Sequence, residues 1–373
     1  MTEVLLVPFH PPGHAEPMAA LAAQLRADGH PVTVFTGSAT GRWRLNGPLP
    51  PSMLATADSG ALFRHLFLGD VADMARDIAD LAGRCGAEVI VGDVLMAGAG
   101  LAARLTGLPW VSVCCSPVPT LEAYRSFIPD HAIGAFAPHS TLESLGLPAD
   151  DPTNLLGRSS DWLHLIPSTP SFAGYPDLPA AVVLAGPLVP VPLVSAPAVV
   201  GTPTVAVTTS TAAPATLAGA AFAQDRYVTA AAAALGGLDV LGVVTHQVVG
   251  RPPANVRFVG RIPHDELFDR SAVVVTHAGW GTVSRALVRG LPLVLVPIAN
   301  DQTYIAQRCA QLGIGIALAA GEATVDALRE AIRAVLVEPG YRAAAAEFAT
   351  EFRVSPPLPR ISSMITSLPA RKG

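Results

Sequence analysis

Short runs of apolar, mostly β-branched residues recur along this chain, separated by stretches rich in alanine and leucine. In the first half the runs are Val4–Val7, Val32–Thr36, Glu88–Val91 and Trp110–Cys114. In the second half they are Thr204–Thr208, Val240–Val244, Val256–Val259, Ala272–Thr276 and Pro292–Val296. Uniformly apolar strands that alternate with helices are typical of parallel sheets covered by helices on both faces. The sequence therefore predicts an α/β protein with two Rossmann-like domains.

The domain boundaries follow from a proline-rich segment between the two groups of strands. Nine prolines occur in residues 167–203 and make long regular elements improbable there. We expect an N-terminal domain over residues 1–166, an interdomain linker over 167–203 and a C-terminal domain over 204–340. Residues 341–373 are expected to form a helix and a tail. Return of this segment to the N-terminal domain is one option.

Composition narrows the classes of partner. Half of the residues are hydrophobic, yet no run approaches the 18 or more apolar residues that a membrane span requires. The first ten residues lack a basic region and a cleavage site, so we expect a cytoplasmic protein without a signal peptide. The net charge of −5, with no basic cluster, argues against nucleic acid. Small molecules are the expected partners; a homodimer is one option for the oligomeric state.

The four cysteines show no metal-ligand spacing. Cys114 and Cys115 adjoin within an apolar run, which is typical of reduced thiols in a core, and Cys85 and Cys309 are isolated. We expect neither a disulfide framework nor a metal site.

One turn in the C-terminal half carries most of the functional signal. The segment T-H-A-G-W-G-T, residues Thr276–Thr282, follows the strand A-V-V-V and opens a helix expected at Val283–Arg289. Such a turn aims unpaired backbone N–H groups and the positive end of the helix dipole at one point, which suits a pyrophosphate. An imidazole, two glycines that permit close approach and a hydroxyl would complete this site: His277, Gly279, Gly281 and Thr282.

The next strand delivers Asp301 and Gln302 to the same edge of the sheet, where a carboxylate and a carboxamide can bind sugar hydroxyls. An alternative is dinucleotide binding, because G-W-G-T-V-S nearly matches the G-x-G-x-x-G fingerprint and Asp301 lies 20 residues after Gly281. A dehydrogenase needs neither His277 nor Gln302, so the sugar-nucleotide interpretation is favoured. A second glycine pair, in Gly98–Ala103, is interpreted as a close-packing feature.

A second set of polar residues lies in the N-terminal half. His14 follows the first strand and Asp93 ends the strand E-V-I-V-G-D, so both are expected at the carboxyl edge of one sheet. A histidine held by a carboxylate is a recurrent general base. His10 is a rival for this role. His14 could instead bond to the backbone where the helix begins, and Asp93 could instead form a turn that caps the next helix.

These residues resemble the family-one glycosyltransferases of GT-B fold, particularly the bacterial enzymes that glycosylate antibiotics and other natural products. The stretch Phe258–Gln302, F-V-G-R-I-P-H-D-E-L-F…V-V-T-H-A-G-W-G-T…G-L-P-L-V-L-V-P-I-A-N-D-Q, is similar to the family's signature. The N-terminal similarity is looser and covers Gly13–Met18 and Asp28–Thr36. The resemblance implies two Rossmann-like domains facing each other across a cleft, and inverting transfer of a sugar from a dTDP- or UDP-sugar to a small acceptor without a metal or other cofactor.

The resemblance also implies roles for individual residues. Its catalytic histidine and aspartate fall on His14 and Asp93. Diphosphate contacts fall on His277, Gly281 and Thr282, and sugar contacts on Asp301 and Gln302. The facing donor loop falls on Thr209, Ser210 and Thr211. Where many relatives have W-x-P-Q, this chain has Arg261-Ile262-Pro263-His264, so a guanidinium is expected to stack on the nucleobase in place of tryptophan.

Acceptors of the family are typically aromatic or polyketide-like. Candidate pocket residues, each equally explicable as a core residue, are Trp43, Phe63, Phe67, Tyr124 and Phe127. Two other functions stay open from the sequence: a nucleotide-sugar epimerase of the same fold and a noncatalytic accessory protein that binds a sugar nucleotide.

Overall fold

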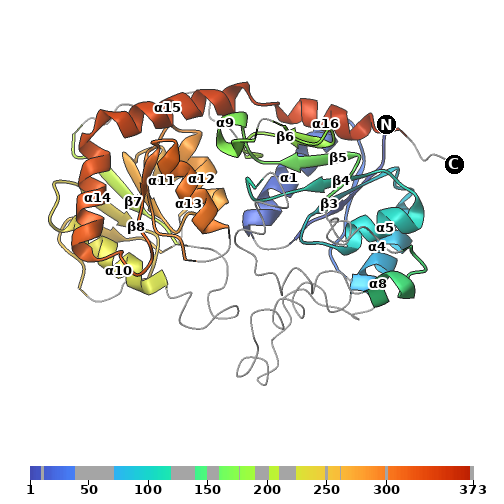
Figure 1. Cartoon of the computed structure of the whole chain (residues 1–373), viewed down its shortest axis with the longest axis horizontal. Helices are drawn as coiled ribbons and strands as arrows, with labels where there is room; N and C mark the ends of the chain where they lie inside the picture. The colour runs from blue at the N-terminus through green and yellow to red at the C-terminus, as the bar shows by residue number, and fades with distance from the viewer. Residues whose placement is uncertain are drawn as a thin grey trace, which may run out of the picture. The chain divides into compact units, whose positions relative to one another are not determined.

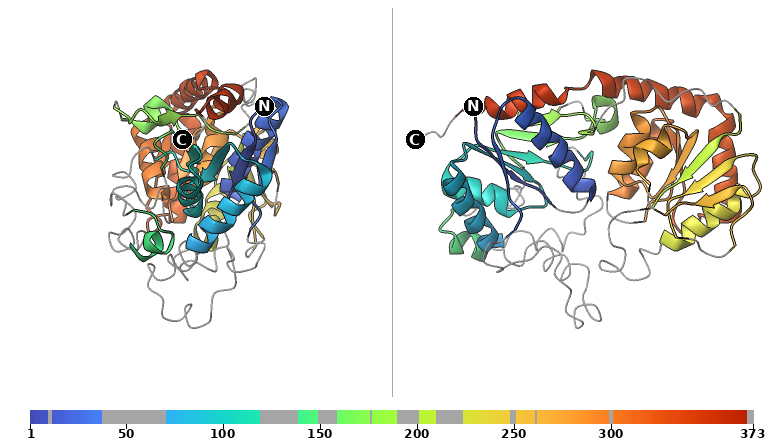
Figure 2. Two further views of the ribbon diagram at one scale, coloured as in Figure 1. Left: turned by 90° about the vertical axis from the view of Figure 1, so that its right-hand side faces the viewer. Right: turned by 180° about the vertical axis from the view of Figure 1, so that it is seen from behind.

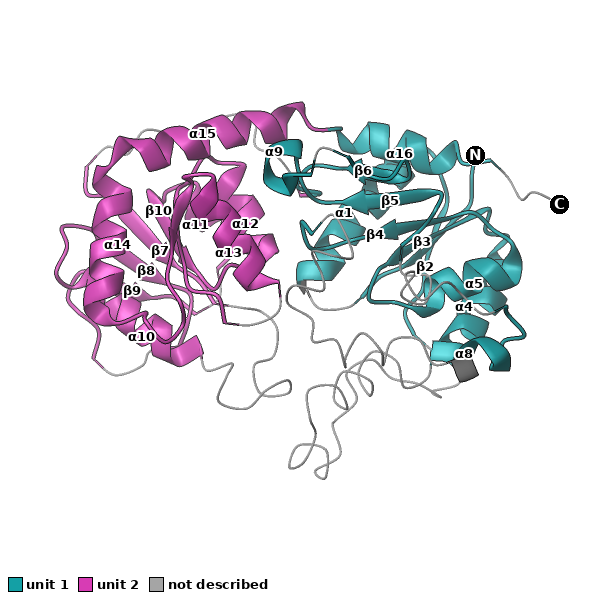
Figure 3. Cartoon of the chain, in the orientation of Figure 1, with its two compact units in different colours: residues 1–188, 356–373 teal, residues 189–355 magenta. Residues whose placement is uncertain are grey.

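The structure is a computed structural model that describes residues 1–9, 12–37, 71–118, 139–148, 159–175, 177–189, 201–209, 224–247, 251–260, 262–298 and 301–369. The chain divides into two compact units, residues 1–188 with 356–373 and residues 189–355 (Figure 3). Each unit contains one six-stranded sheet in which every recorded pairing is parallel. The expected α/β fold with two Rossmann-like domains is confirmed.

The first sheet has the strand order β2-β1-β3-β4-β5-β6. Its strands are β1 (Val4–Val7), β2 (Val32–Val34), β3 (Val89–Asp93), β4 (Trp110–Val113), β5 (Leu163–Ile166) and β6 (Val182–Leu184). The described helices of this unit are α1 (Pro12–Ala27), α4 (Val71–Cys85), α5 (Gly98–Thr106), α8 (His139–Ser144), α9 (Pro170–Ala173) and α16 (Leu358–Thr366).

Alternate residues of the central strands serve two cores. Val4 and Leu6 of β1 pack with Met18, Leu21 and Leu25 of α1 and with Ile361 and Ile365 of α16. Leu5 and Val7 point to the opposite face and pack with Met74 and Ile78 of α4 and with Ala99 and Ala102 of α5. Because successive strand side chains point to opposite faces, a strand covered on both sides must be apolar throughout. Figures 1 and 2 show these helices on the two faces.

The first unit extends beyond its expected boundary at residue 166. Residues 167–188, expected as linker, contain α9 and β6, and β6 pairs with β5 in the first sheet. The prolines do not prevent this, because Pro170 occupies the first turn of α9, where Thr169 caps the helix and proline is tolerated. The three residues of β6 form the edge strand between Pro179 and Pro187. The end of the chain also belongs to this unit, through α16.

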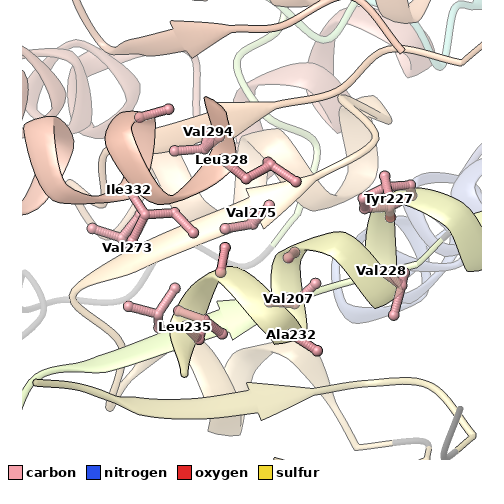
Figure 4. Packing of buried hydrophobic residues seen from close by; sticks show 14 of the residues in the cluster. Val207, Tyr227, Val228, Ala232, Leu235, Val273, Val275, Val294, Leu328 and Ile332 are labelled. Carbon is pink, nitrogen blue, oxygen red and sulfur yellow. The ribbon is translucent and has the colours of Figure 1, made fainter. Parts of the chain in front are cut away.

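The second sheet has the order β12-β11-β10-β7-β8-β9. Its strands are β7 (Thr204–Val207), β8 (Leu241–Val244), β9 (Val256–Phe258), β10 (Val273–Thr276), β11 (Leu293–Leu295) and β12 (Gly315–Ala317). The described helices are α10 (Gln224–Leu235), α11 (His264–Phe268), α12 (Trp280–Leu287), α13 (Gln302–Gln311), α14 (Val325–Val337) and α15 (Pro339–Val354). One core packs Val207, Val273, Val275 and Val294 against α10 and α14 (Figure 4). Among the described residues, no helix has the length and apolar character to cross a membrane.

The strand orders place one switch point in each sheet. In the first unit the chain moves outward from β1 to β2 and returns on the other side of β1 to form β3. In the second unit it moves from β7 to β8 and β9 and returns beside β7 to form β10. Ligands of open α/β sheets bind beyond the carboxyl ends of the strands at such points. The fold therefore predicts ligand sites at the carboxyl ends of β1 and β3 in the first sheet, and of β7 and β10 in the second.

Two glycines permit close packing next to the switch point of the first sheet. A Cβ added at Gly92 of β3 would lie 2.5 Å from Cβ of Ala99 on α5, and one at Gly98 would lie 2.6 Å from Cγ of Met74 on α4. Gly98 of α5 is thus a close-packing position, as expected, although it packs against another helix and not against a strand.

Gly92→Ala is expected to lower the free energy of unfolding by about 1–3 kcal/mol, because β3 and α5 must separate to admit the new methyl group. Gly83→Ala is the matched control: Gly83 lies within α4 with no atom within 4 Å of an added Cβ, so alanine should be neutral or stabilising there. Urea denaturation of both variants measures the difference. Equal midpoints would contradict the close contact.

Candidate active site

His14 and Asp93 form a hydrogen-bonded pair at the switch point of the first sheet. His14 lies in the first turn of α1, which begins at Pro12. Asp93 is the last residue of β3 and is completely buried. The His14 Nδ1 atom lies 2.8 Å from Asp93 Oδ2. The expected proximity of the two side chains is therefore confirmed.

The surroundings of Asp93 favour its ionised form. Burial alone would raise the pKa of Asp93, but the charge of His14, its hydrogen bond, the Leu95 amide and the Cys115 thiol together lower it. The ionised carboxyl group accepts a hydrogen from His14 Nδ1, so the neutral form of the ring carries its lone pair on Nε2. The Leu95 amide donates to Asp93 Oδ1 at 2.8 Å. Asp93 thus forms a local turn as well as holding the histidine, but it does not cap α5, whose N-cap is Ala97.

The ring of His14 is also held from its side. Phe9 makes an edge-on contact with it, with 5.1 Å between the ring centroids and an interplanar angle of 87°. The His14 side chain keeps 27% of its surface exposed, whereas Asp93 has none. An oriented imidazole that is partly exposed can accept a proton from a bound molecule.

Cys115 joins this pair, which sequence reasoning missed. Its Sγ atom lies 3.1 Å from Asp93 Oδ2 and 3.8 Å from the backbone oxygen of His14. The strand register explains this, because Val113 of β4 pairs with Asp93 of β3 and Cys115 follows two residues later. The sequence feature that could have indicated this role is the position of Cys115 just beyond the end of a strand, at the same edge of the sheet as Asp93.

The second switch point carries His277, immediately after β10. Ala278 adopts a left-handed conformation with φ 68°, and Gly279 is the N-cap of α12 with φ −65° and ψ 133°. A Cβ at Gly279 would collide with Nε2 of His277, so the imidazole lies over the start of the helix. His277 is 5% exposed, and its Nδ1 has no hydrogen-bond partner among the residues that the structure describes.

An unpartnered buried nitrogen of this kind suits a ligand that accepts a hydrogen bond. A buried polar atom without a partner costs about 1–3 kcal/mol, so native proteins rarely keep one without a reason. The N-terminus of α12 supplies N–H groups and a positive dipole at the same place. An anion that accepts hydrogen bonds from both fits this arrangement.

A second histidine lies close to His277. Burial and then the neighbouring His264 lower the pKa of His277 to about 4. Burial and then Arg285 lower the pKa of His264 to about 4, against an opposing effect of Asp265. His264 stacks on Phe268, with 5.1 Å between ring centroids. Both imidazoles are therefore neutral near pH 7, and both can gain positive charge when an anion binds.

The other expected donor residues lie at the same edge of the second sheet. Thr209 follows β7 and donates to the Thr245 backbone oxygen at 3.0 Å. Gly281 and Thr282 belong to the first turn of α12, Ile262 precedes α11, and Asp301 is the N-cap of α13. The Gln302 side-chain oxygen accepts from the Ile298 amide at 2.9 Å. Part of Gln302 therefore holds the strand-to-helix turn together, a structural role that its sequence position did not indicate.

Several expected site residues lie outside the described residues. These are Ser210 and Thr211 of the donor loop, Arg261 of the nucleobase site, the rival base His10 and the acceptor-pocket candidates Trp43, Phe63, Phe67, Tyr124 and Phe127. Their roles stay predictions.

Known proteins resemble this chain over its C-terminal part or over most of its length. Residues 229–367 match the family described as "Erythromycin biosynthesis protein CIII-like, C-terminal domain". Over 91% of its length the chain is 28% identical to 4'-demethylrebeccamycin synthase of Lentzea aerocolonigenes, 93% of which is covered. It is 39% identical to 3-alpha-mycarosylerythronolide B desosaminyl transferase of Saccharopolyspora erythraea, over 29% of this chain and 26% of that protein.

Solved structures show the same fold. The kitacinnamycin glycotransferase superposes with a TM-score of 0.75 at 20% identity, covering 98% of both chains. The glycosyltransferase VinC, solved in complex with dTDP, superposes with a TM-score of 0.71 at 21% identity and covers 98% of this chain and 99% of its own.

Proposed function

Because this chain is a glycosyltransferase of GT-B fold, related to those of antibiotic biosynthesis, we propose that it transfers a sugar, with inversion, from a dTDP- or UDP-sugar to a hydroxyl of a small natural-product-like acceptor. The observation that carries the proposal is the pair of His14 and Asp93 at the switch point of the first sheet. The unpartnered His277 at the start of α12 supports the donor site.

His14 acts as the general base in this proposal. Its Nε2 takes the proton of the acceptor hydroxyl, while Asp93 holds the other ring nitrogen and stabilises the imidazolium that forms. The acceptor oxygen attacks the anomeric carbon from the face opposite the diphosphate. One displacement of this kind inverts the anomeric configuration.

The second unit stabilises the departing diphosphate. Charge that develops on it is met by the N–H groups of α12, by Thr282 and by His277, in a buried setting where such interactions are strong. These groups provide the stabilisation that a metal ion gives in other transferases, so the proposed reaction needs no metal. Asp301 and Gln302 are proposed to bind the sugar.

Support for a deoxysugar carried on dTDP comes from the relatives. One of them is named as a desosaminyl transferase, and VinC was solved with dTDP. Arg261 is proposed to stack on the nucleobase. The natural-product character of the acceptor rests on the same relatives.

Acceptor-dependent release of nucleoside diphosphate tests the proposal. The protein is incubated with dTDP- and UDP-sugars, with and without a panel of polyketide and aromatic alcohols, and the diphosphate and the glycoside are both quantified. Transfer gives both products in equal amounts only with an acceptor. A changed sugar without acceptor would indicate an epimerase, binding without turnover would indicate an accessory protein, and tight NAD binding without a response to dTDP or UDP would indicate a dinucleotide site.

Donor binding is expected to strengthen as the pH falls. His277 is neutral when free, with a pKa of about 4, and a diphosphate beside it favours the protonated ring and raises that pKa. At a pH between the pKa of His277 in the free protein and its pKa in the complex, binding is accompanied by uptake of a proton. In this range the affinity rises by up to about tenfold for each unit by which the pH falls. Titration calorimetry with dTDP-glucose in buffers of different ionisation enthalpy measures the uptake. His264, Arg285 and Asp265 remain in His277→Gln, so equal uptake by that variant would contradict the assignment.

A further inference from the structure

Three potential metal ligands lie close together at the carboxyl edge of the first sheet. His14 Nδ1, Asp93 Oδ2 and Cys115 Sγ all lie within 4.8 Å of one another, with 2.8 Å between the nitrogen and the oxygen and 3.1 Å between the sulfur and the oxygen. Tetrahedral zinc has bonds of about 2.0–2.3 Å to such atoms, which places neighbouring ligand atoms roughly 3.3–3.6 Å apart. The nitrogen–oxygen pair and the sulfur–oxygen pair therefore need to separate by only a few tenths of an ångström to hold the ion.

The chemistry of the three ligands favours a thiophilic cation. Thiolate, imidazole and carboxylate together are a zinc ligand set, and three protein ligands leave a fourth position for water. Asp93 is completely buried and Cys115 is 8% exposed, so a cation meets little competing water, while the partly exposed His14 provides a way in. Local sequence spacing could not reveal this set, because its members come from three segments that are far apart in the chain.

We propose that His14, Asp93 and Cys115 bind Zn²⁺ or a similar thiophilic divalent cation, and that this ion inhibits the protein. The Cys115 thiol loses its proton to solvent and binds as thiolate. The ring proton of His14 moves from Nδ1 to Nε2 through solvent, and Nδ1 binds the ion. The two anionic ligands then balance the two positive charges. The ion replaces the hydrogen bonds that Asp93 now accepts from His14 and Cys115.

Inhibition follows from the imidazole itself. A neutral ring has one lone pair, and the ion uses it at Nδ1. Nε2 then carries a hydrogen and cannot take the proton of an acceptor. The ion is thus an inhibitor at this site and not a cofactor. Metal binding depends only on the three side chains, whereas inhibition rests on the proposed function of His14.

Titration of chelator-treated protein with Co²⁺ tests the site without any sugar substrate. One equivalent is expected to produce the thiolate-to-cobalt charge-transfer band of a tetrahedral site, and Zn²⁺ should displace it. Cys115→Ser should remove the band. It should also weaken metal binding by more than about 100-fold, because loss of a residue that only hydrogen-bonds to a metal ligand already costs about 10–100-fold. His14→Ala should also weaken it. Cys85→Ser, at a half-buried thiol on α4, is the matched control and should keep the band.

The absence of a band in the wild-type protein, or an unchanged band in Cys115→Ser, would overturn the site. Turnover measured at increasing Zn²⁺ gives a separate result. Loss of turnover in proportion to site occupancy, reversed by a chelator, supports inhibition through His14. Occupancy with full turnover would overturn the inhibition and the role of His14 as base, while the metal site itself would stand.

Discussion

His14→Ala is expected to lower turnover of an alcohol acceptor by about 10²–10⁴-fold and to leave the affinity for nucleoside diphosphate nearly unchanged. The base acts only in the chemical step, and the expected diphosphate residues belong to the other unit. Asp93→Asn should act in the same direction but less strongly, because the histidine stays while its ionised partner is lost. The double variant should be little worse than His14→Ala, since residues that act as one unit are not additive.

The acceptor must be chosen with care for this experiment. An acidic phenol ionises without help and would hide the loss, so the assay uses an alcohol with the wild-type protein as reference. Calorimetric titration with dTDP or UDP checks that donor binding survives, and a thermal unfolding curve checks that the variant is folded. Full turnover of an alcohol by folded His14→Ala would place the base elsewhere, and His10 would be the next residue to replace.

The features predicted well from the sequence depend on local pattern. Strands β1, β3, β4, β7 and β10 are apolar on both faces because helices cover both sides, and that produces runs that are visible without a structure. His14 and Asp93 could be paired in advance because carboxyl ends of parallel strands share one edge.

The features that were missed depend on register or on tertiary packing. Cys115 reaches Asp93 only because Val113 pairs with Asp93, a register that apolar runs do not specify. The strand β6 lies within the proline-rich segment that was expected to be a linker, and only its pairing with β5 identifies it as a strand. The structural bond of Gln302 to the Ile298 amide crosses a turn, and no residue type along the sequence marks it.

His277→Ala is expected to weaken binding of dTDP or UDP by about 10–100-fold, which corresponds to roughly 1.5–3 kcal/mol for one charge-assisted hydrogen bond. The buried Nδ1 without a described partner is the reason, because a ligand that accepts its hydrogen satisfies a nitrogen that no described residue pairs with. Calorimetric titration of the folded variant measures the loss.

Gly279→Ala tests the same site through its geometry. The backbone at Gly279 has φ −65° and ψ 133°, which alanine adopts without strain, so only the collision of the new Cβ with the His277 ring opposes the change. The ring must then move off the start of α12, and the loss of nucleotide affinity should approach that of His277→Ala, with little further loss in the double variant. Gly321→Ala, where an added Cβ meets nothing within 4 Å, should bind nucleotide normally. Wild-type affinity in Gly279→Ala would mean that the diphosphate does not depend on the position of this imidazole.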